Sequence, residues 1–94
     1  NMSLTFQWDE KKSGRNLRKH GISFEEAATV FGDPLSLTIP DPLHSETEDR
    51  FVTVGRSDGG KTFVVVHSET AEVIRIISAR EATKHERKAY EEGD

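Results

Sequence analysis

The stretch Val73-Ile74-Arg75-Ile76-Ile77-Ser78-Ala79-Arg80-Glu81-Ala82-Thr83 decides the fold of this chain. It opens with branched apolar residues, which favour a β-strand. Thr83 and Glu86 have the spacing of a capping box, so we expect a helix from about Thr83 to Glu92. Arg75 lies inside the strand and Arg80 at the strand–helix corner, and an Arg inside an otherwise apolar strand is costly unless it is paired or open to a cleft. Either they carry chemistry, or Arg75 faces solvent and Arg80 pairs with a nearby carboxylate.

Three more strands are expected upstream. Leu35, Leu37 and Ile39 alternate with polar residues, which predicts a strand with one buried face, followed by a polar loop over residues 40–49. Residues 50–56 and 61–68 are strand-like and flank a hairpin turn at residues 57–60. Residues 63–66 are continuously apolar, as in a central strand covered on both faces. Short turns join these strands, so we expect antiparallel pairing.

The N-terminal part predicts a short strand and two helices. Residues 5–8 alternate, and Asp9 is a good N-cap for a helix that runs to about His20, before Gly21. Leu17 is nearly the sole apolar residue of that helix, so we expect a narrow contact with the core. A second capping box, Ser23 with Glu26, starts the next helix, which residues 32–34 stop. Its two phenylalanines and the preceding Trp8 are expected in the core.

These elements predict one α+β domain over residues 1–94, with two N-terminal helices, an antiparallel sheet of four to five strands and a C-terminal helix. Two helices should cover one face of the sheet and leave the other partly open, where Arg75 could point. Asn1 precedes Met2, so we expect it to be a cloning remnant. The chain has no cysteine, no run near the roughly 18 apolar residues of a membrane span and no signal-peptide pattern. We therefore expect a cytoplasmic protein that does not bind membranes.

The charge distribution points to a phosphate-rich substrate. The formal net charge of -4 argues against an indiscriminate nucleic-acid binder, but the charges are segregated. Residues 11–20 hold no acid, while acids gather in residues 41–49 and 91–94. Ten of the 13 Lys and Arg residues fall in two groups: Lys11, Lys12, Arg15, Arg18 and Lys19 in the first, and Arg75, Arg80, Lys84, Arg87 and Lys88, mixed with Glu81 and Glu86, in the second.

Several classes of active site are excluded by their missing motifs. The four histidines, His20, His44, His67 and His85, lack the spacing of metal ligands, so we expect no metal and no cofactor. Phosphate-binding glycine loops and a nucleophilic serine elbow are also missing. A metal-free site of basic residues with His, Glu or Tyr remains, and such a site can cleave RNA. The ribose 2′-OH attacks the adjacent phosphorus, so the protein supplies general acid–base groups and cations for the transition state.

Ordered motifs span nearly the whole chain. They are Trp8-Asp9 with Lys12 and Asn16, then residues 19–27 (KHGISFEEA), Val30-Phe31 with Asp33-Pro34, Asp41-Pro42 with His44, Glu48 with Arg50, Gly55-Arg56, residues 74–80 (IRIISAR) with Ala82-Thr83, Glu86-Arg87 and Tyr90. These motifs resemble the BrnT family of bacterial toxins, within the wider RelE/ParE-like group.

The resemblance implies a RelE-like fold and a ribonuclease that stops translation, acting on RNA either free or on the ribosome. It implies a type II toxin–antitoxin system in which a cognate antitoxin, BrnA, neutralises the toxin and carries the DNA-binding region, so promoter DNA is contacted only through the antitoxin. The wider group shares a fold without sharing one catalytic set. A ParE-like gyrase poison and a non-catalytic nucleic-acid- or protein-binding module therefore stay open as alternatives.

Each candidate site residue has a functional and a structural interpretation. Arg75 and Arg80 gain most from the resemblance as catalytic residues. His20 is a candidate acid or base, or a donor to its own helix end. His67, which we expect at the end of the central strand, and Tyr90, which could stack a base or donate a proton, complete the catalytic set, but both could be packing residues. The candidates for RNA binding are Lys12, Lys19, Arg15, Arg56 and Arg18, which could also be solvated surface charges.

Overall fold

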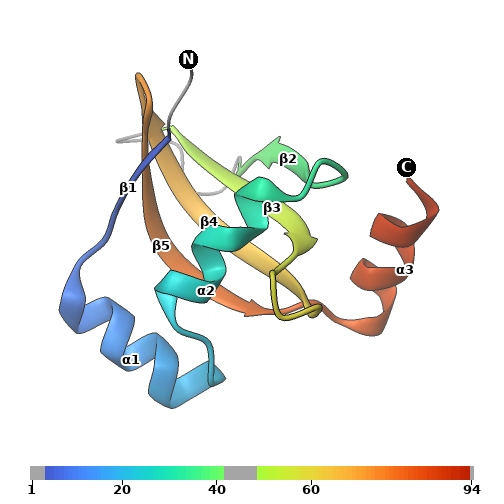
Figure 1. Ribbon diagram of the computed structural model, residues 1–94, viewed down its shortest axis with the longest axis horizontal. Coiled ribbons are helices and arrows are strands. Elements are labelled where there is room, and N and C mark those ends of the chain that lie inside the picture. The colour runs from blue at the N-terminus through green and yellow to red at the C-terminus, as the bar shows by residue number, and fades with distance from the viewer. Residues whose placement is uncertain (1–3, 42–48, 94) are drawn as a thin grey trace.

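A five-stranded sheet with the most apolar strand at its centre organises the structure (Figure 1). The computed structural model describes residues 4–41 and 49–93. Along the chain the elements are β1 (Thr5–Gln7), α1 (Glu10–His20), α2 (Phe24–Ala28), the 3-10 helix η1 (Thr29–Gly32), β2 (Leu37–Pro40), β3 (Arg50–Arg56), β4 (Thr62–Thr70), β5 (Val73–Glu81) and α3 (Lys84–Glu92). The strand order is β1-β5-β4-β3-β2, which confirms the prediction that residues 63–66 belong to a central strand.

The sheet is mixed, whereas the sequence predicted an antiparallel one. β2, β3, β4 and β5 pair antiparallel in succession, but β1 pairs parallel with β5. Short turns force antiparallel pairing only on strands that follow one another. β1 is separated from β5 by most of the chain, so no turn constrains its direction.

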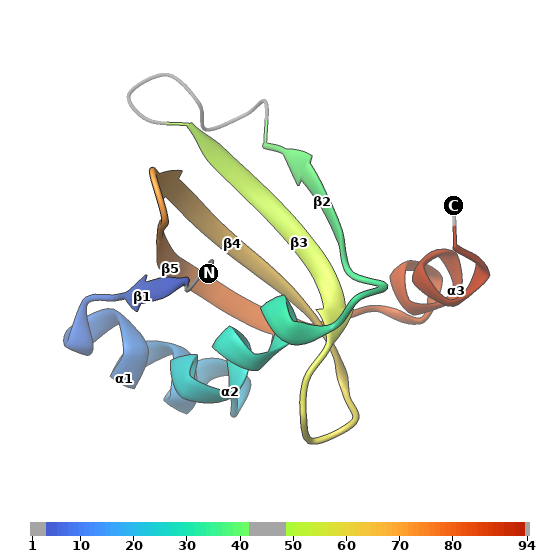
Figure 2. The ribbon, with the colours of Figure 1, turned by 45° about the horizontal axis from the view of Figure 1, so that its top comes forward.

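The N-terminal helices lie against one side of the sheet (Figure 2). Asp9 caps α1 through the amides of Lys11 and Lys12, and Gly21 ends that helix in the left-handed conformation. Beneath the helices, alternate strand residues join apolar residues of α2 and η1 in one core. Its buried members are Ile22, Phe24, Ala27, Val30, Phe63, Val65, Ile74, Ile76 and Ala79, with Trp8 packed against them.

α1 is attached to the sheet by an amide and not by a leucine. The prediction that Leu17 makes the core contact is wrong, because Leu17 is 51% exposed. Among residues 10–20 the buried one is Asn16. Its Nδ2 donates to the carbonyls of Ile22 (3.0 Å) and Ala79 (2.9 Å), and its Oδ1 accepts from the Ala79 amide (3.1 Å).

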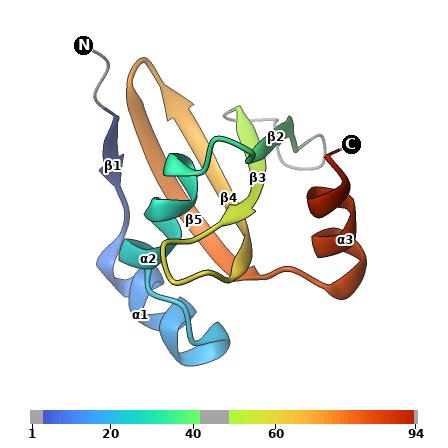
Figure 3. The same cartoon turned by 45° about the vertical axis from the view of Figure 1, so that its right-hand side comes forward.

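The opposite face of the sheet is partly open. α3 stands beside the β2–β3 end of that face (Figure 3). The predicted burial of one face of residues 35–39 is wrong, because every residue of β2 is exposed. Alternation of apolar residues identifies an apolar face but not whether another element covers it. The expectations for Asn1 and for loop residues 42–48, which include the family motif residues His44 and Glu48, lie outside the described residues.

The Asn16 side chain should contribute more to stability than any apolar residue of α1. Asn16→Ala leaves the Ala79 amide and carbonyl buried without partners, which typically costs about 1–3 kcal/mol per group. The melting temperature should fall by roughly 8 °C or more, because two such groups cost about 2 kcal/mol at least and the usual shift is about 4–8 °C per kcal/mol in a domain of this size. Thermal unfolding followed by circular dichroism measures this decrease in melting temperature.

Arg18→Ala is the matched control, since Arg18 is exposed on the same helix. It should melt within about 2 °C of the parent chain, as exposed substitutions usually do. Equal melting temperatures for the two variants would contradict the role of Asn16.

Candidate functional site

Four basic side chains of α1 surround a hollow at the edge of β5. Its volume is about 340 Å³, and its lining residues are Lys12, Arg15, Asn16, Lys19, His20, Ile77 and Ser78. β1 pairs with residues 73–75 of β5 only, so the edge beyond Arg75 is left for α1. A β-bulge between Val66 and His67 leaves Ile77 without a direct partner on β4 and turns this segment outward. The hollow therefore combines cations, an imidazole and strand-edge residues.

Arg75 and Arg80 lie on β5 and are placed on the open face of the sheet. Cross-strand register places Arg75 opposite Ser68 and Arg80 opposite Val64, both of which face away from α1 and α2. Arg75 is exposed, as the sequence allowed. The structure thus brings Lys12, Arg15, Lys19 and His20 together at the edge of β5, with Arg75 and Arg80 on the face beside it.

Arg80 is held by Glu86 at the start of α3. The guanidinium donates from Nη1 to Oε1 and from Nη2 to Oε2, each over 2.8 Å, which is a bidentate pair. Glu86 also accepts from the Thr83 amide in the capping box that the sequence predicted. The hydrogen bonds from Arg80 lower the pKa of Glu86 to about 2. The ion pair that the structural interpretation of Arg80 requires is therefore present.

Tyr90 fastens the other end of α3. Its hydroxyl donates to Oδ2 of Asp33, which also accepts from the Arg56 amide at 2.8 Å. Burial and the hydrogen bond to Asp33 raise the pKa of Tyr90. The Arg56 guanidinium lies over the Tyr90 ring, 5.9 Å from its centroid, and 3.7 Å from Glu91. Tyr90 is buried, so this geometry favours the packing interpretation over contact with RNA.

His67 is a core residue, and the structure corrects its predicted place at a strand end. It lies inside β4 and has no exposed surface. Its ring meets Phe31 edge-on at 4.8 Å and stacks on Phe51 at 5.9 Å. Nε2 hydrogen-bonds Thr53 at 2.7 Å, and burial lowers the pKa of His67 to about 4. A neutral, enclosed ring cannot reach a phosphodiester.

The sequence did not point to Asn16, Asp33 or Ser78 as parts of this arrangement. Asn16 was visible only as a family motif residue, although a polar residue on a helix poor in apolar ones is a usable signal. Arg18 and Arg56 do not line the hollow at β5.

Within residues 4–41 and 49–93, no group of three or more His, Cys, Asp or Glu residues is placed to hold a metal ion. No helix in those ranges is long and apolar enough to cross a membrane.

Comparisons with known proteins agree with this architecture. A family model described as the ribonuclease toxin BrnT of type II toxin–antitoxin systems matches residues 8–86. The 1.1 Å crystal structure of the Brucella abortus ribonuclease toxin BrnT superposes with a TM-score of 0.68 at 21% identity, covering 87% of this chain and 100% of that one. No curated protein sequence matches significantly. At this identity the superposition shows a shared fold.

The Arg80–Glu86 pair should make folding stability sensitive to acid. The ordinary pKa of the Glu86 carboxyl is 4.5 and its pKa in the folded chain is about 2, so the unfolded chain binds the proton more tightly. The contribution of this carboxylate is complete above about pH 4.5 and is lost as the pH falls toward about 2. The stability difference between the parent chain and Glu86→Gln should therefore shrink over that window, as urea midpoints at several pH values will show.

Arg80→Gln tests the cause of this behaviour, because it removes the guanidinium and leaves the capping box. Its acid sensitivity should be reduced in the same window. A stability gap between the parent chain and Glu86→Gln that stays constant from pH 5 to pH 2 would contradict the pairing.

Proposed function

The chain belongs to the BrnT family of ribonuclease toxins of type II toxin–antitoxin systems, and we propose that it is a metal-independent RNA endonuclease that inhibits translation. A BrnA-like antitoxin is the proposed partner that neutralises it. One observation carries the proposal: an exposed histidine and three basic side chains line a hollow at the edge of β5. Cations and an imidazole are the groups that cleavage by the ribose 2′-OH requires.

In this proposal the α1 cluster binds the scissile phosphate region and moves a proton. Lys12, Arg15 and Lys19 hold phosphate oxygens, since their exposed side chains converge on the hollow. His20 exchanges a proton with the ribose hydroxyl or the leaving 5′-oxygen, because an imidazole ring carries nitrogens that can donate or accept a proton. The exposed position of His20 suits this role in a way that the buried ring of His67 does not.

Arg75 and Arg80, which both belong to β5, complete the proposed site. Arg75 is an exposed cation that RNA can meet directly as it crosses β5 from the hollow to the open face. The Arg80 side chain is 43% exposed, so Glu86 fixes the orientation of the guanidinium while part of it remains accessible. We propose that this oriented guanidinium stabilises the extra charge of the pentavalent transition state. Tyr90 takes no step, because it fastens α3 through Asp33.

Cleavage of RNA by the purified chain tests the proposal. Attack by the 2′-OH leaves 2′,3′-cyclic or 3′-phosphate ends, and a site without a metal keeps its activity in excess EDTA. Purified protein incubated with naked RNA and with translating ribosomes, followed by mapping of the new ends, measures both features. RNA that is bound and left intact would indicate a binding module, and DNA breaks with gyrase present would indicate a gyrase poison; either would overturn the proposal.

A pair of histidine variants tests the site in the same assay. His20→Gln should slow cleavage by about 10²–10⁴-fold, the usual contribution of a general acid or base. His85→Gln is the matched control, because His85 is exposed but lies on α3, outside the hollow. Its cleavage rate should equal that of the parent chain. If both variants cleave equally well, His20 is not the proton-transfer group.

Arg80→Lys separates transition-state stabilisation from binding. Lysine keeps the charge but not the planar fork that holds two oxygens at once. Cleavage should fall by about 10²–10³-fold, which is the scale of one electrostatic donor, with little loss of RNA affinity.

Arg18→Ala should instead weaken binding modestly and flatten its salt dependence. Cleavage rates, RNA affinities and melting temperatures are measured on each variant, and a folded, fully active Arg80→Ala chain would refute the role.

A further inference from the structure

The open face of the sheet carries arginines and no strand carboxylate. By register the charged residues that the described strands place on this face are Arg50, Arg75 and Arg80, with Arg56 at the end of β3 beside α3. The two acids of those strands are Glu69 and Glu81. Glu69 is opposite Ile74 and Glu81 opposite Phe63, so both register on the face that α1 and α2 cover. The chain has a formal net charge of -4, yet its described strands place no acidic residue on the open face of the sheet.

Between the arginines lies an apolar strip. Ile39 and Val52 form one cross-strand pair, and Leu37 and Val54 form the next. Ile39 is 61% exposed and Leu37 36% exposed, although both sit in an apolar row. The strip borders α3 in a groove of about 270 Å³, whose lining is completed by Val64, Arg80, His85, Glu86, Ala89 and Tyr90. One end of an apolar groove thus adjoins an arginine of the proposed cleavage site.

The strip suits a protein segment better than RNA. Single-stranded RNA binds on sheets through aromatic side chains on which its bases stack. Here the strand side chains are Leu, Ile and Val, which bury apolar side chains of a partner but offer no ring for stacking; the rings in the groove, His85 and the buried Tyr90, belong to α3. The arginines around the strip attract carboxylates by complementarity. Carboxylates already meet two of them, because Glu86 pairs with Arg80 and Glu91 lies 3.7 Å from Arg56.

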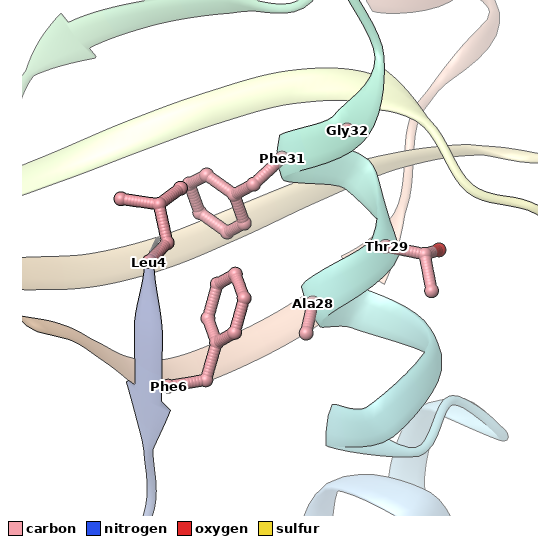
Figure 4. A pocket seen from close by; sticks show the side chains of 6 residues that line it. All are labelled: Leu4, Phe6, Ala28, Thr29, Phe31 and Gly32. Carbon is pink, nitrogen blue, oxygen red and sulfur yellow. The ribbon is translucent and has the colours of Figure 1, made fainter. Parts of the chain in front are cut away.

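A second apolar pocket serves as a contrast. It lies on the other side of the sheet, between β1 and the α2–η1 segment, where Phe6 and Phe31 point toward one another with Leu4 beside them (Figure 4). Its lining, which Thr29 and Gly32 complete, contains no charged side chain. Its lining residues carry no charge that could select a partner. This pocket therefore differs in electrostatics from the groove beside α3, although both have an apolar lining.

We propose that the strip formed by Leu37, Ile39, Val52 and Val54, bordered by arginines and by α3, is the docking site of an amphipathic acidic helix of the antitoxin. The apolar side of that helix packs on the strip, and its carboxylates meet the arginines at the two ends. Arg50 and Arg56 flank the strip along β3 and are six residues apart, or roughly 20 Å at the usual rise of a strand. At about 1.5 Å per residue, carboxylates three to four helical turns apart span this distance.

This inference rests on the proposed function and adds the place and chemistry of neutralisation. A helix seated on the strip lies against Arg80 and covers the open face beside β5, so RNA and antitoxin exclude each other there. The antitoxin helix need not contact the hollow beside α1, because that hollow lies at the edge of β5.

The test uses the antitoxin encoded beside this chain, co-expressed and purified with it. Ile39→Glu and Leu37→Glu place a charge where the apolar side of the partner helix packs, and each should weaken the complex at least tenfold by calorimetry. Both variants should still cleave RNA, because neither residue belongs to the proposed cleavage site. In growth assays they should be toxins that the antitoxin no longer rescues. Leu4→Glu, an exposed leucine of the contrasting pocket, should bind the antitoxin like the parent chain.

The outcomes separate this inference from the proposed function. No complex with the parent chain would overturn the toxin–antitoxin partnership and the docking site together. A complex that Ile39→Glu and Leu37→Glu leave unchanged would overturn the docking site alone. Loss of RNA cleavage with intact antitoxin binding in these variants would make the strip an RNA surface and would also overturn it. Hydrogen exchange that slows at residues 37–39 and 52–54 on antitoxin binding would support it.

Discussion

The side-chain amide of Asn16 is the contact on which the candidate site depends. A strand edge presents amides and carbonyls that need partners. β1 supplies partners for residues 73–75 only, and the Asn16 amide then donates to and accepts from Ala79 as a neighbouring peptide group would. The same amide holds the carbonyl of Ile22, which begins the segment leading to α2. One side chain thus closes the edge and fixes the position of both helices.

This mode of attachment explains why α1 can be so polar. A helix fixed by apolar packing needs a stripe of buried side chains, which would occupy the positions of its cations. A helix fixed by one amide keeps most of its surface in water, and the cluster of Lys12, Arg15, Lys19 and His20 is the result. α3 follows the same logic, because Arg80 holds its first turn and Asp33 holds Tyr90 near its end. Directional polar contacts therefore place both helices while leaving most of their charged side chains accessible.

The sequence predicted the elements well because their signals are local. Caps at Asp9, Ser23 and Thr83, the hairpin turn and the apolar run of β4 each depend on a few neighbouring residues. Contacts between distant segments were not predictable in this way. The parallel pairing of β1, the exposure of Leu17 and Ile39 and the burial of His67 all depend on what packs against a residue, which no local pattern encodes. Glu26 illustrates the limit: Ser23 caps its amide, but its carboxylate accepts from Ser57 across the fold.

The candidate site combines two kinds of cation, and the difference has a physical consequence. Lys12 and Lys19 are flexible point charges on a wet helix, so they attract phosphate over a distance but fix no geometry. Arg80 is already oriented by two hydrogen bonds, so little side-chain entropy is left to lose when it meets a phosphate. Glu86 reduces the net charge at that corner, which weakens its attraction for a phosphate. In general, a group that binds weakly but is already in position favours a transition state over the substrate. The proposed division of roles between α1 and the β5–α3 corner therefore rests on the hydrogen-bonding state of each cation more than on its charge.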